Sequence, residues 1–312
     1  MKKYFLLICS LIVSLFFGIS CTTNTASNQS KAFNEFIANN SPIITAHRGY
    51  ASIAPENTIA AFEAAVNIGA DACEFDVQIS KDGTLIVIHD KTVDRTTNGE
   101  GKVAKLTDEY LRSLDAGSWK DEKFKGEKIP TLEETLIYLK SHDMVAVLEI
   151  KASNIEDAVV ELLYKTEMEE KTIIISFDEN TVKGILKNHP KIPALLLLSK
   201  RYMFGDAEIK AAKIMDKAKK VGTTYIGPFS FQGENLSDEA KYNLSNSIDP
   251  GELVLALDSK TIKILHENGY IIDAWTVDSV ENIRDLIKSN VDILTTNYLE
   301  QAITAKRDII NK

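Results

Sequence analysis

The feature that most limits the possible folds is an alternation of short β-branched segments with amphipathic segments from Pro42 onward. Eight strands are expected, at residues 43–47, 72–78, 145–151, 172–177, 194–199, 223–227, 270–277 and 292–297. Helical periodicity is expected at residues 57–68, 131–141, 155–169, 179–188, 207–221, 259–268 and 279–289. Such alternation forms a parallel sheet, and eight units in a chain of this length predict a closed TIM (β/α)8 barrel. A doubly wound open sheet is the structural alternative.

Two long connections interrupt the alternation. The turn signal Lys81-Asp82-Gly83-Thr84 predicts that residues 85–89 fold back beside the second strand. An insertion at about residues 90–130 follows, and residues 228–251, rich in Ser and Asn, form the second connection. Because long insertions in barrels are usually functional rims or lids, we expect the first insertion to be a rim or lid.

The amino terminus has the order of an export signal. Two lysines precede an apolar run over residues 4–17, and small residues lead to Cys21. The run is short for a membrane span. We expect residues 1–20 to be a signal peptide, residues 21–41 a lipidated Cys21 with a polar tether, and residues 42–312 the barrel domain. The resemblance of this segment to a bacterial lipobox implies an exported protein, lipid-anchored to the cell envelope; an ordinary cleaved signal and a retained anchor are the alternatives.

Composition narrows the function classes. The chain has 312 residues, 44% hydrophobic and 26% charged, which excludes collagen, disorder and a multi-span membrane protein. Its net charge of -9 argues against a nucleic-acid partner. An anionic substrate would therefore need a metal ion or a few placed cations. After removal of the signal and lipidation of Cys21, Cys73 has no disulfide partner, and a small buried hydrophobe is the simplest interpretation.

Unusual polar residues gather at the carboxyl ends of the first three expected strands. They are His47, Arg48, Glu74, Asp76, Glu149 and Lys151. The strand period of two puts Glu74 and Asp76 on one face, and likewise Glu149 and Lys151. If that face is the barrel interior, the residues converge at the mouth, where barrel enzymes have their active sites. Three converging carboxylates need a counter-charge, and a hard divalent cation, Mg²⁺ or Ca²⁺, meets that need.

Each piece also has a simpler explanation. Glu74 and Asp76 fit the solvent face of an edge strand, and Glu149 with Lys151 fits a surface ion pair. His89-Asp90 fits a turn cap. Three other histidines, His142, His189 and His266, lie on or at the ends of expected helices and are assigned no function. Arg48 has more weight, because the chain has only six Arg against thirty Lys and Arg binds phosphate in a bidentate manner.

An ordered series of motifs resembles the glycerophosphodiester phosphodiesterase family in its bacterial lipoprotein form. In chain order the motifs are Ala46-His47-Arg48-Gly49, Ala54-Pro55-Glu56-Asn57-Thr58, Glu74-Phe75-Asp76-Val77, Lys81-Asp82-Gly83, His89-Asp90, Asp94-Arg95-Thr96-Thr97-Asn98-Gly99, Ile129-Pro130-Thr131-Leu132, Leu148-Glu149-Ile150-Lys151, Trp275-Thr276-Val277 and Thr295-Thr296-Asn297. The series covers residues 43 to about 300. The family is a TIM barrel with a small insertion after its second strand, as expected above from the strand count.

The resemblance implies roles for particular residues. The metal would be held by Glu74, Asp76 and Glu149, and the acid/base pair would be His47 and His89. Phosphate oxygens would be bound by Arg48 and Lys151, and Trp275 would line the pocket for the alcohol or glycerol end. Without the resemblance, Thr58 is expected to cap a helix, and Asn57 is open as a residue that orients a ligand. Two departures from the family pattern, Asp278 and Tyr298, concern the rim of the site. The family's layout also implies that the insertion, with Trp119 and Phe124, roofs the mouth near Trp275, which favours a small soluble substrate over a lysolipid.

The implied reaction is the metal-dependent hydrolysis of a small-molecule glycerophosphodiester to glycerol 3-phosphate and an alcohol. Such a reaction needs charge stabilisation at the phosphoryl oxygens and proton transfer near neutral pH, which two histidines provide. A lysophospholipase D acting on lysophospholipids is the rival enzyme, and an inactive barrel that binds a phosphodiester is the rival from another class. No obligate protein partner is implied.

Overall fold

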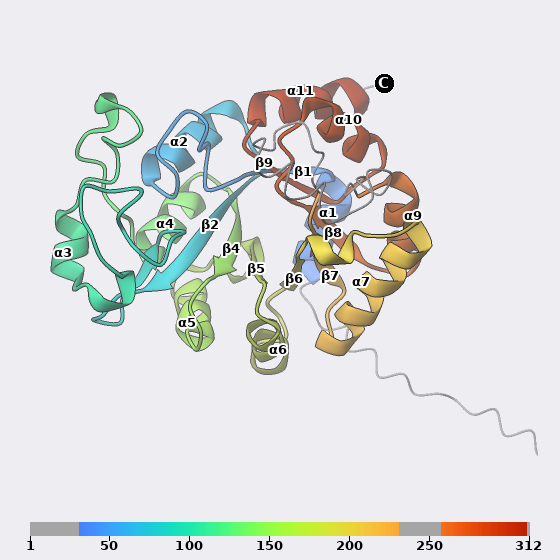
Figure 1. Cartoon of the computed structure of the whole chain (residues 1–312), viewed down its shortest axis with the longest axis horizontal. Coiled ribbons are helices and arrows are strands. Elements are labelled where there is room, and N and C mark those ends of the chain that lie inside the picture. The colour runs from blue at the N-terminus through green and yellow to red at the C-terminus, as the bar shows by residue number, and fades with distance from the viewer. Residues whose placement is uncertain (1–30, 231–256, 311–312) are drawn as a thin grey trace, which may run out of the picture.

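The computed structural model describes residues 31–230 and 257–310, which form a barrel surrounded by helices (Figure 1). Its sheet has nine strands in the order β1-β9-β8-β7-β6-β5-β4-β2-β3, and a further pairing of β1 with β2 closes the barrel. All neighbours pair in parallel except β3, which runs antiparallel beside β2. Closure excludes the open doubly wound sheet and confirms the predicted (β/α)8 barrel.

All eight predicted barrel strands are present, most of them slightly shorter than expected. Their bounds, with β3 added, are β1 Ile43–Ala46, β2 Ala72–Ile79, β3 Leu85–Val87, β4 Val145–Ile150, β5 Thr172–Ser176, β6 Ala194–Leu198, β7 Tyr225–Pro228, β8 Ile271–Ala274 and β9 Ile293–Thr296. The predicted helices are α2 Ile59–Ile68, α4 Leu132–Ser141, α5 Glu156–Thr166, α6 Glu179–Asn188, α7 Ala207–Val221, α9 Ser259–Glu267 and α10 Val280–Lys288. The described residues contain three further α-helices, α1 Lys31–Asn40, α3 Asp108–Ser113 and α11 Leu299–Ile310.

Short polar side chains fix where the outer helices begin. Thr58 caps α2, as the sequence predicts, by accepting a hydrogen bond from the backbone of Ala61. At the start of α4, Thr131 and Glu134 form a reciprocal capping box. Further caps of this kind are Asp178 for α6, Asp206 for α7, Asp258 for α9 and Ser279 for α10. These caps end the loops at the barrel mouth at defined points.

The amino-terminal helix α1 corrects the predicted tether. The sequence predicts a tether over residues 21–41, but Lys31–Asn40 is helical, and Phe33 and Ile37 are buried among the first residues of the barrel strands. The Tyr225 hydroxyl also donates a hydrogen bond to Asn34. Apolar residues spaced three and four apart were hidden within a polar stretch, so the helix was missed. The predicted signal peptide and Cys21 lie outside the described residues.

Apolar side chains fill two separate layers. The larger core lies between the barrel and its helices, and Cys73 belongs to it, as predicted. The smaller core fills the half of the barrel at the amino ends of the strands, and α1 closes that end. Because this half is packed, the interior opens at the carboxyl ends of the strands. Within the described ranges, no helix has both the length and the apolar character needed to cross a membrane.

The insertion after β3 is a small unit beside the barrel. It contains α3 and has its own apolar cluster, which includes Val93, Val103, Leu111 and Leu114. In Figure 1, α3 lies at the edge of the molecule next to α2 and α4, and β8 lies on the other side of the barrel. The second predicted connection falls largely within residues 231–256, outside the described residues.

Candidate active site

A cavity of about 120 Å³ opens at the carboxyl ends of the barrel strands. One side, the charged wall, consists of His47, Arg48, Glu74, His89, Glu149 and Lys151. The opposite side, the apolar wall, consists of Ile175, Phe177, Leu197 and Trp275. Asp273, Thr276 and Thr295 complete the lining. The predicted site residues therefore share one cavity, except Asp76, which is buried behind the charged wall.

The turn after β1 positions the first carboxylate. Arg48 and Gly49 both have positive φ, at 55° and 74°, and a side chain on Gly49 would meet the backbone of Ala61. Glycine is therefore required at that position. The turn points the backbone N–H of Arg48 at Glu74, which accepts its hydrogen bond at 2.8 Å. A strained backbone at a functional site is a common arrangement, and here it holds one carboxylate in place.

Three buried carboxylates converge on β2 and β4. Glu74, Asp76 and Glu149 each offer an oxygen, and these oxygens lie within 4.8 Å of one another. Asn57 holds Asp76 from behind, since its side-chain amide donates to Asp76 at 2.8 Å and its oxygen accepts from the Asp76 backbone at 3.2 Å. This pair of bonds confirms Asn57 as a residue that orients a carboxylate, the possibility that its sequence left open.

The charge on this triad is only partly balanced by the protein. Burial, together with the neighbouring carboxylates, raises the pKa of Glu74 well above its usual range. The same causes raise the pKa of Glu149 to about 7. A set of buried oxygen ligands whose mutual repulsion disfavours ionisation fits a divalent cation, which would stabilise all three ionised carboxylates together.

Two cationic side chains flank the triad. The Arg48 Nε lies 3.6 Å from Asp76 and has no hydrogen-bond partner among the described residues, although it is buried. The Lys151 Nζ lies 3.1 Å from Glu149 and 3.5 Å from Asp76. Burial alone would lower the pKa of Lys151, but the carboxylates raise it, so the lysine stays cationic. The unpaired Arg48 donor is suited to an anionic oxygen of a ligand.

His47 lies at the β1 edge of the charged wall, where an amide orients it. Its Nδ1 is 3.0 Å from the side-chain oxygen of Asn297. Asn297 in turn donates through its amide nitrogen to Asp278 at 2.7 Å, so its oxygen must face the histidine. This assignment makes Nδ1 the donor and leaves Nε2, which is 4.0 Å from Glu74, able to accept a proton. Burial and the adjacent Arg48 lower the pKa of His47.

His89 is oriented by a carboxylate instead. Its Nδ1 donates to Asp90 at 2.7 Å, and Arg95 holds the same carboxylate through its Nε at 2.6 Å. The arginine hydrogen bond lowers the pKa of Asp90 to about 2. Arg95 and Arg48 both donate to Glu56 as well, so Glu56 links the two ends of the charged wall. The Nε2 of His89 is left for the cavity.

Comparison with known proteins agrees with this geometry. The model of the glycerophosphoryl diester phosphodiesterase family matches residues 47–301. A glycerophosphodiester phosphodiesterase from Caldanaerobacter subterraneus subsp. tengcongensis is 35% identical over 270 residues, covering 85% of this chain and 98% of the relative. The chain belongs to the glycerophosphoryl diester phosphodiesterase family.

Further proteins are similar to this chain in sequence or in fold over most of their length. A Bacillus subtilis glycerophosphodiester phosphodiesterase is 29% identical, covering 82% of this chain and 83% of the relative. The crystal structure of an Agrobacterium tumefaciens glycerophosphodiester phosphodiesterase has a TM-score of 0.64 at 27% identity, covering 84% of this chain and 99% of that one. An Oleispira antarctica phosphodiesterase in complex with the product sn-glycerol-3-phosphate has a TM-score of 0.69 at 23% identity, covering 90% and 99% of the two chains.

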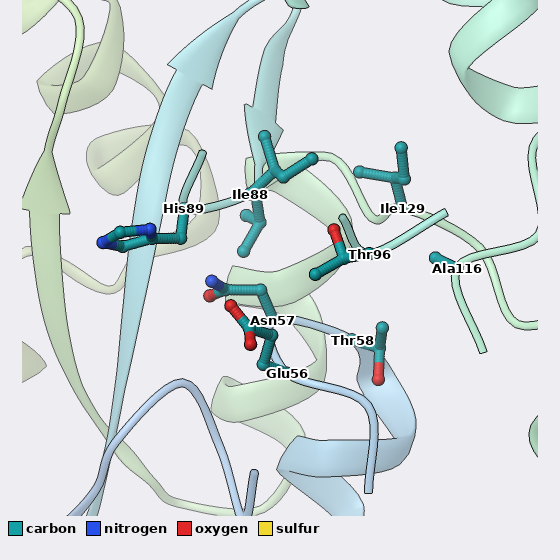
Figure 2. Close-up of a pocket in the computed structure, with 9 residues that line it drawn as sticks. Glu56, Asn57, Thr58, Ile88, His89, Thr96, Ala116 and Ile129 are labelled. Carbon is teal, nitrogen blue, oxygen red and sulfur yellow. The ribbon is translucent and has the colours of Figure 1, made fainter. Parts of the chain in front are cut away.

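The insertion contributes Arg95, which holds the Asp90 partner of His89, but it does not roof the mouth near Trp275. Figure 2 shows a small pocket lined by Glu56 and Asn57 and by insertion residues Thr96, Ala116 and Ile129, with the polar ends of Glu56 and Asn57 and the His89 ring turned away from the insertion residues. Among the described residues, none of residues 91–130 lines the cavity. The predicted roof is therefore wrong: the insertion packs beside the barrel because its apolar cluster adjoins β3.

Trp275 lies on the apolar wall, as the family resemblance implies. Its indole N–H donates to the Gly227 carbonyl at 2.6 Å. The rings of Phe177 and Phe229 pack edge-on against it, with centroids 5.2 and 5.5 Å away. Thr276 also lines the cavity, because β8 ends at Ala274 and the strand alternation no longer separates the two residues.

Sequence reasoning missed the residues that orient the histidines and the polar residue on the cavity floor. Asp90, Arg95 and Asn297 stand within quoted motifs, yet nothing in the motifs assigns them to a histidine. Asp278 is a departure from the family pattern that proves to anchor Asn297. Asp273 is a single polar residue in an apolar strand, so no pattern in the sequence marks it.

Proposed function

We propose that the protein hydrolyses glycerophosphodiesters to glycerol 3-phosphate and an alcohol with the help of one divalent cation. The observation that carries the proposal is the meeting of three carboxylates, two cations and two oriented histidines around one cavity. Every charge in this group serves a step of phosphodiester hydrolysis. A barrel that only bound the diester would not need both histidines to present a free Nε2.

Glu74, Asp76 and Glu149 would hold the cation. A purely carboxylate set favours a hard ion, Mg²⁺ or Ca²⁺, over zinc, which prefers histidine and cysteine. When bound, the cation supplies electrostatic stabilisation of the charge that develops on the phosphoryl oxygens.

Arg48 and Lys151 bind the remaining phosphoryl oxygens. Arg48 and Lys151 both line the cavity, so their positive charges act on a phosphoryl group bound there, and the Arg48 Nε has no hydrogen-bond partner among the described residues. Their fixed positive charges stabilise the transition state more than the substrate, because negative charge increases at the oxygens during the reaction.

The two histidines transfer the protons. The attacking group, water or the neighbouring glycerol hydroxyl, must lose a proton, and the leaving oxygen must gain one. His47 and His89 each hold a hydrogen on Nδ1, so each can use Nε2 for one of these transfers.

A phosphorus NMR time course tests the reaction. Glycerophosphocholine should give glycerol 3-phosphate with added Mg²⁺ or Ca²⁺ and no product after exhaustive chelation. Undiminished turnover of the chelated protein would contradict the role of the cation. Absence of turnover with either ion would favour the inactive binding barrel.

We also propose a small soluble substrate over a lysolipid. The cavity of about 120 Å³ suits a glycerol or compact alcohol end, whereas an acyl chain needs a longer apolar channel. The insertion no longer supports this preference, but the cavity size does. A kcat/KM for lysophosphatidylcholine at or above that for glycerophosphocholine would favour the lysophospholipase D instead.

We propose, finally, that Cys21 carries a lipid that anchors the exported protein to the cell envelope. The tract from Cys21 to Lys31 reaches at most roughly 35 Å if fully extended. Because α1 closes the barrel at the end opposite the mouth, an anchor there would favour a mouth that faces away from the membrane, toward soluble substrates. Cells with Cys21→Ala should release the protein into the soluble envelope fraction; equal release of the wild type would refute the anchor.

A further inference from the structure

An unpaired carboxyl lies on the floor of the cavity. Asp273, on β8, is only 1% exposed, yet it is one of the residues that line the cavity. Its Oδ1 accepts a hydrogen bond from the Thr295 hydroxyl at 2.9 Å. Its Oδ2 has no hydrogen-bond partner in the part of the chain that the structure describes.

An unpaired buried carboxyl oxygen reduces the stability of the folded protein unless a ligand or another polar group pairs with it. Buried polar groups are almost always hydrogen-bonded, and an unmet carboxyl oxygen destabilises the fold. The other carboxylates of the site have partners: Asp76 accepts from Asn57, and Glu149 lies against Lys151. An apolar residue at position 273 would continue the packed layer below it, so the cost needs a functional explanation.

The position of Asp273 suits the far end of a substrate held by the charged wall. In the closed strand order, β8 lies four places from β4 in either direction, so Asp273 faces Glu149 and Lys151 across the barrel. The interior of an eight-stranded barrel is only wide enough for side chains or one small ligand. A phosphoryl group on the charged wall would therefore leave the three-carbon chain of a glycerol moiety on the side of the cavity that Asp273 lines.

A neutral hydroxyl fits this carboxyl better than a cation. Burial raises the pKa of Asp273 to about 7, so the acid and its anion are both present near neutral pH. A hydroxyl can donate to the anion and accept from the acid, whereas an ammonium needs the anion alone. The apolar wall of the same cavity consists of Ile175, Phe177, Leu197 and Trp275, which offer an ammonium no hydrogen-bond acceptor to replace its lost water.

We propose that Asp273, held by Thr295, binds the terminal hydroxyl of the glycerol moiety and makes the enzyme select glycerol over alcohols that lack this hydroxyl. The inference rests on the proposed hydrolysis of glycerophosphodiesters and adds a specificity-determining residue to it. Asp273 takes no part in the bond-breaking step. Its removal should therefore change substrate preference and leave the chemistry of the charged wall intact.

The test compares two diesters that share a choline headgroup. Glycerophosphocholine has the terminal hydroxyl, and 2-hydroxypropyl phosphocholine lacks only that group. Asp273→Val should lower kcat/KM for glycerophosphocholine by roughly tenfold to a hundredfold, the loss expected for a hydrogen bond to a charged or partly charged group. The deoxy substrate should be little affected, so the wild-type preference for glycerol should collapse.

Controls separate this role from a structural one. Thr45→Val removes another buried hydroxyl that has no partner among the described residues and does not line the cavity, so it should leave the substrate preference unchanged. If Asp273→Val folds poorly, Asp273→Val combined with Thr295→Val removes both partners of the hydrogen bond and asks the same question. Glycerophosphoinositol, with a neutral headgroup, should lose as much activity as glycerophosphocholine does.

Three results would overturn the inference. An equal loss on the deoxy substrate would make Asp273 a general structural residue. A loss confined to the choline diesters, with glycerophosphoinositol unaffected, would assign Asp273 to a cationic headgroup. Equal wild-type kcat/KM values for glycerophosphocholine and 2-hydroxypropyl phosphocholine would show that the enzyme does not select the terminal hydroxyl. Wild-type turnover of glycerophosphocholine tests the proposed function separately, since its absence would reject both proposals.

Discussion

The charged wall and the apolar wall face one another across the barrel, and their polar atoms are paired in different ways. On the charged wall, each carboxylate and histidine has a partner that sets its orientation, often held in turn by a third residue. On the opposite side, Asp273 lines the cavity with one carboxyl oxygen that has no partner within the described residues. The comparison indicates that the carboxylates and histidines of the charged wall are oriented before substrate binds, whereas the carboxyl of Asp273 opposite them is paired only when substrate is present.

The largest expected effect is the loss of the charged wall's cation. Glu74→Gln together with Asp76→Asn should reduce turnover to background, because two of the three ligands lose their charge. Isothermal titration with Mg²⁺ and Ca²⁺ should show binding to the wild type and none to the double variant. Glu161→Gln, an exposed change on α5, is the matched control and should behave like the wild type. Turnover by the double variant would remove the cation from the mechanism.

Next in size is the loss of either histidine. His47→Ala and His89→Ala should each lower kcat by roughly 10²–10⁴-fold, the usual range for a general acid or base. Metal binding and melting temperature should stay near those of the wild type, because neither imidazole is in the buried carboxylate triad. His142→Ala, at the end of α4, provides the control. Near-normal kcat in either variant would make that histidine structural.

A smaller effect should appear in the pH dependence of stability without metal. The pKa of Glu149 is raised by burial to about 7 in the folded protein, against an ordinary value of 4.5. Below pH 4.5 the carboxyl is protonated in both states, and as pH rises toward 7 the unfolded state loses its proton first. The metal-free protein should therefore lose roughly 3 kcal/mol of stability over this window.

Thermal melts at several pH values measure this loss, with and without Mg²⁺ or Ca²⁺. Glu149→Gln should flatten the pH dependence of the metal-free protein, and bound cation should flatten it in the wild type. A metal-free melting temperature that rises steadily from pH 5 to 7 would show that the triad does not resist ionisation.

The same comparison explains how far sequence reasoning reached. The barrel was predictable because every strand and most helices repeat a local pattern, and the triad followed from the period of two along β2 and β4. The partner of His47 was not predictable, because Asn297 approaches His47 only through the pairing of β1 with β9. The position of the insertion depends on packing at β3, which no periodicity reports. Asp273 was overlooked because one polar residue in an apolar strand has no pattern of its own.

The smallest expected effect concerns Trp275, which gives the apolar wall its shape. Its ring is fixed by Gly227 and two phenylalanines, so it offers a rigid surface to the carbon chain of the substrate. Trp275→Ala should raise KM for glycerophosphocholine several-fold with a smaller change in kcat, because the lost contact is present in both the bound substrate and the transition state. Trp119→Ala is the matched control: its indole N–H donates to Ala116 within the insertion, away from the cavity. Steady-state kinetics should therefore show a raised KM for Trp275→Ala and an unchanged KM for Trp119→Ala. An equal rise in Trp119→Ala would mean that the insertion covers the mouth during turnover, and a loss of kcat alone in Trp275→Ala would mean that the apolar wall positions the reacting group.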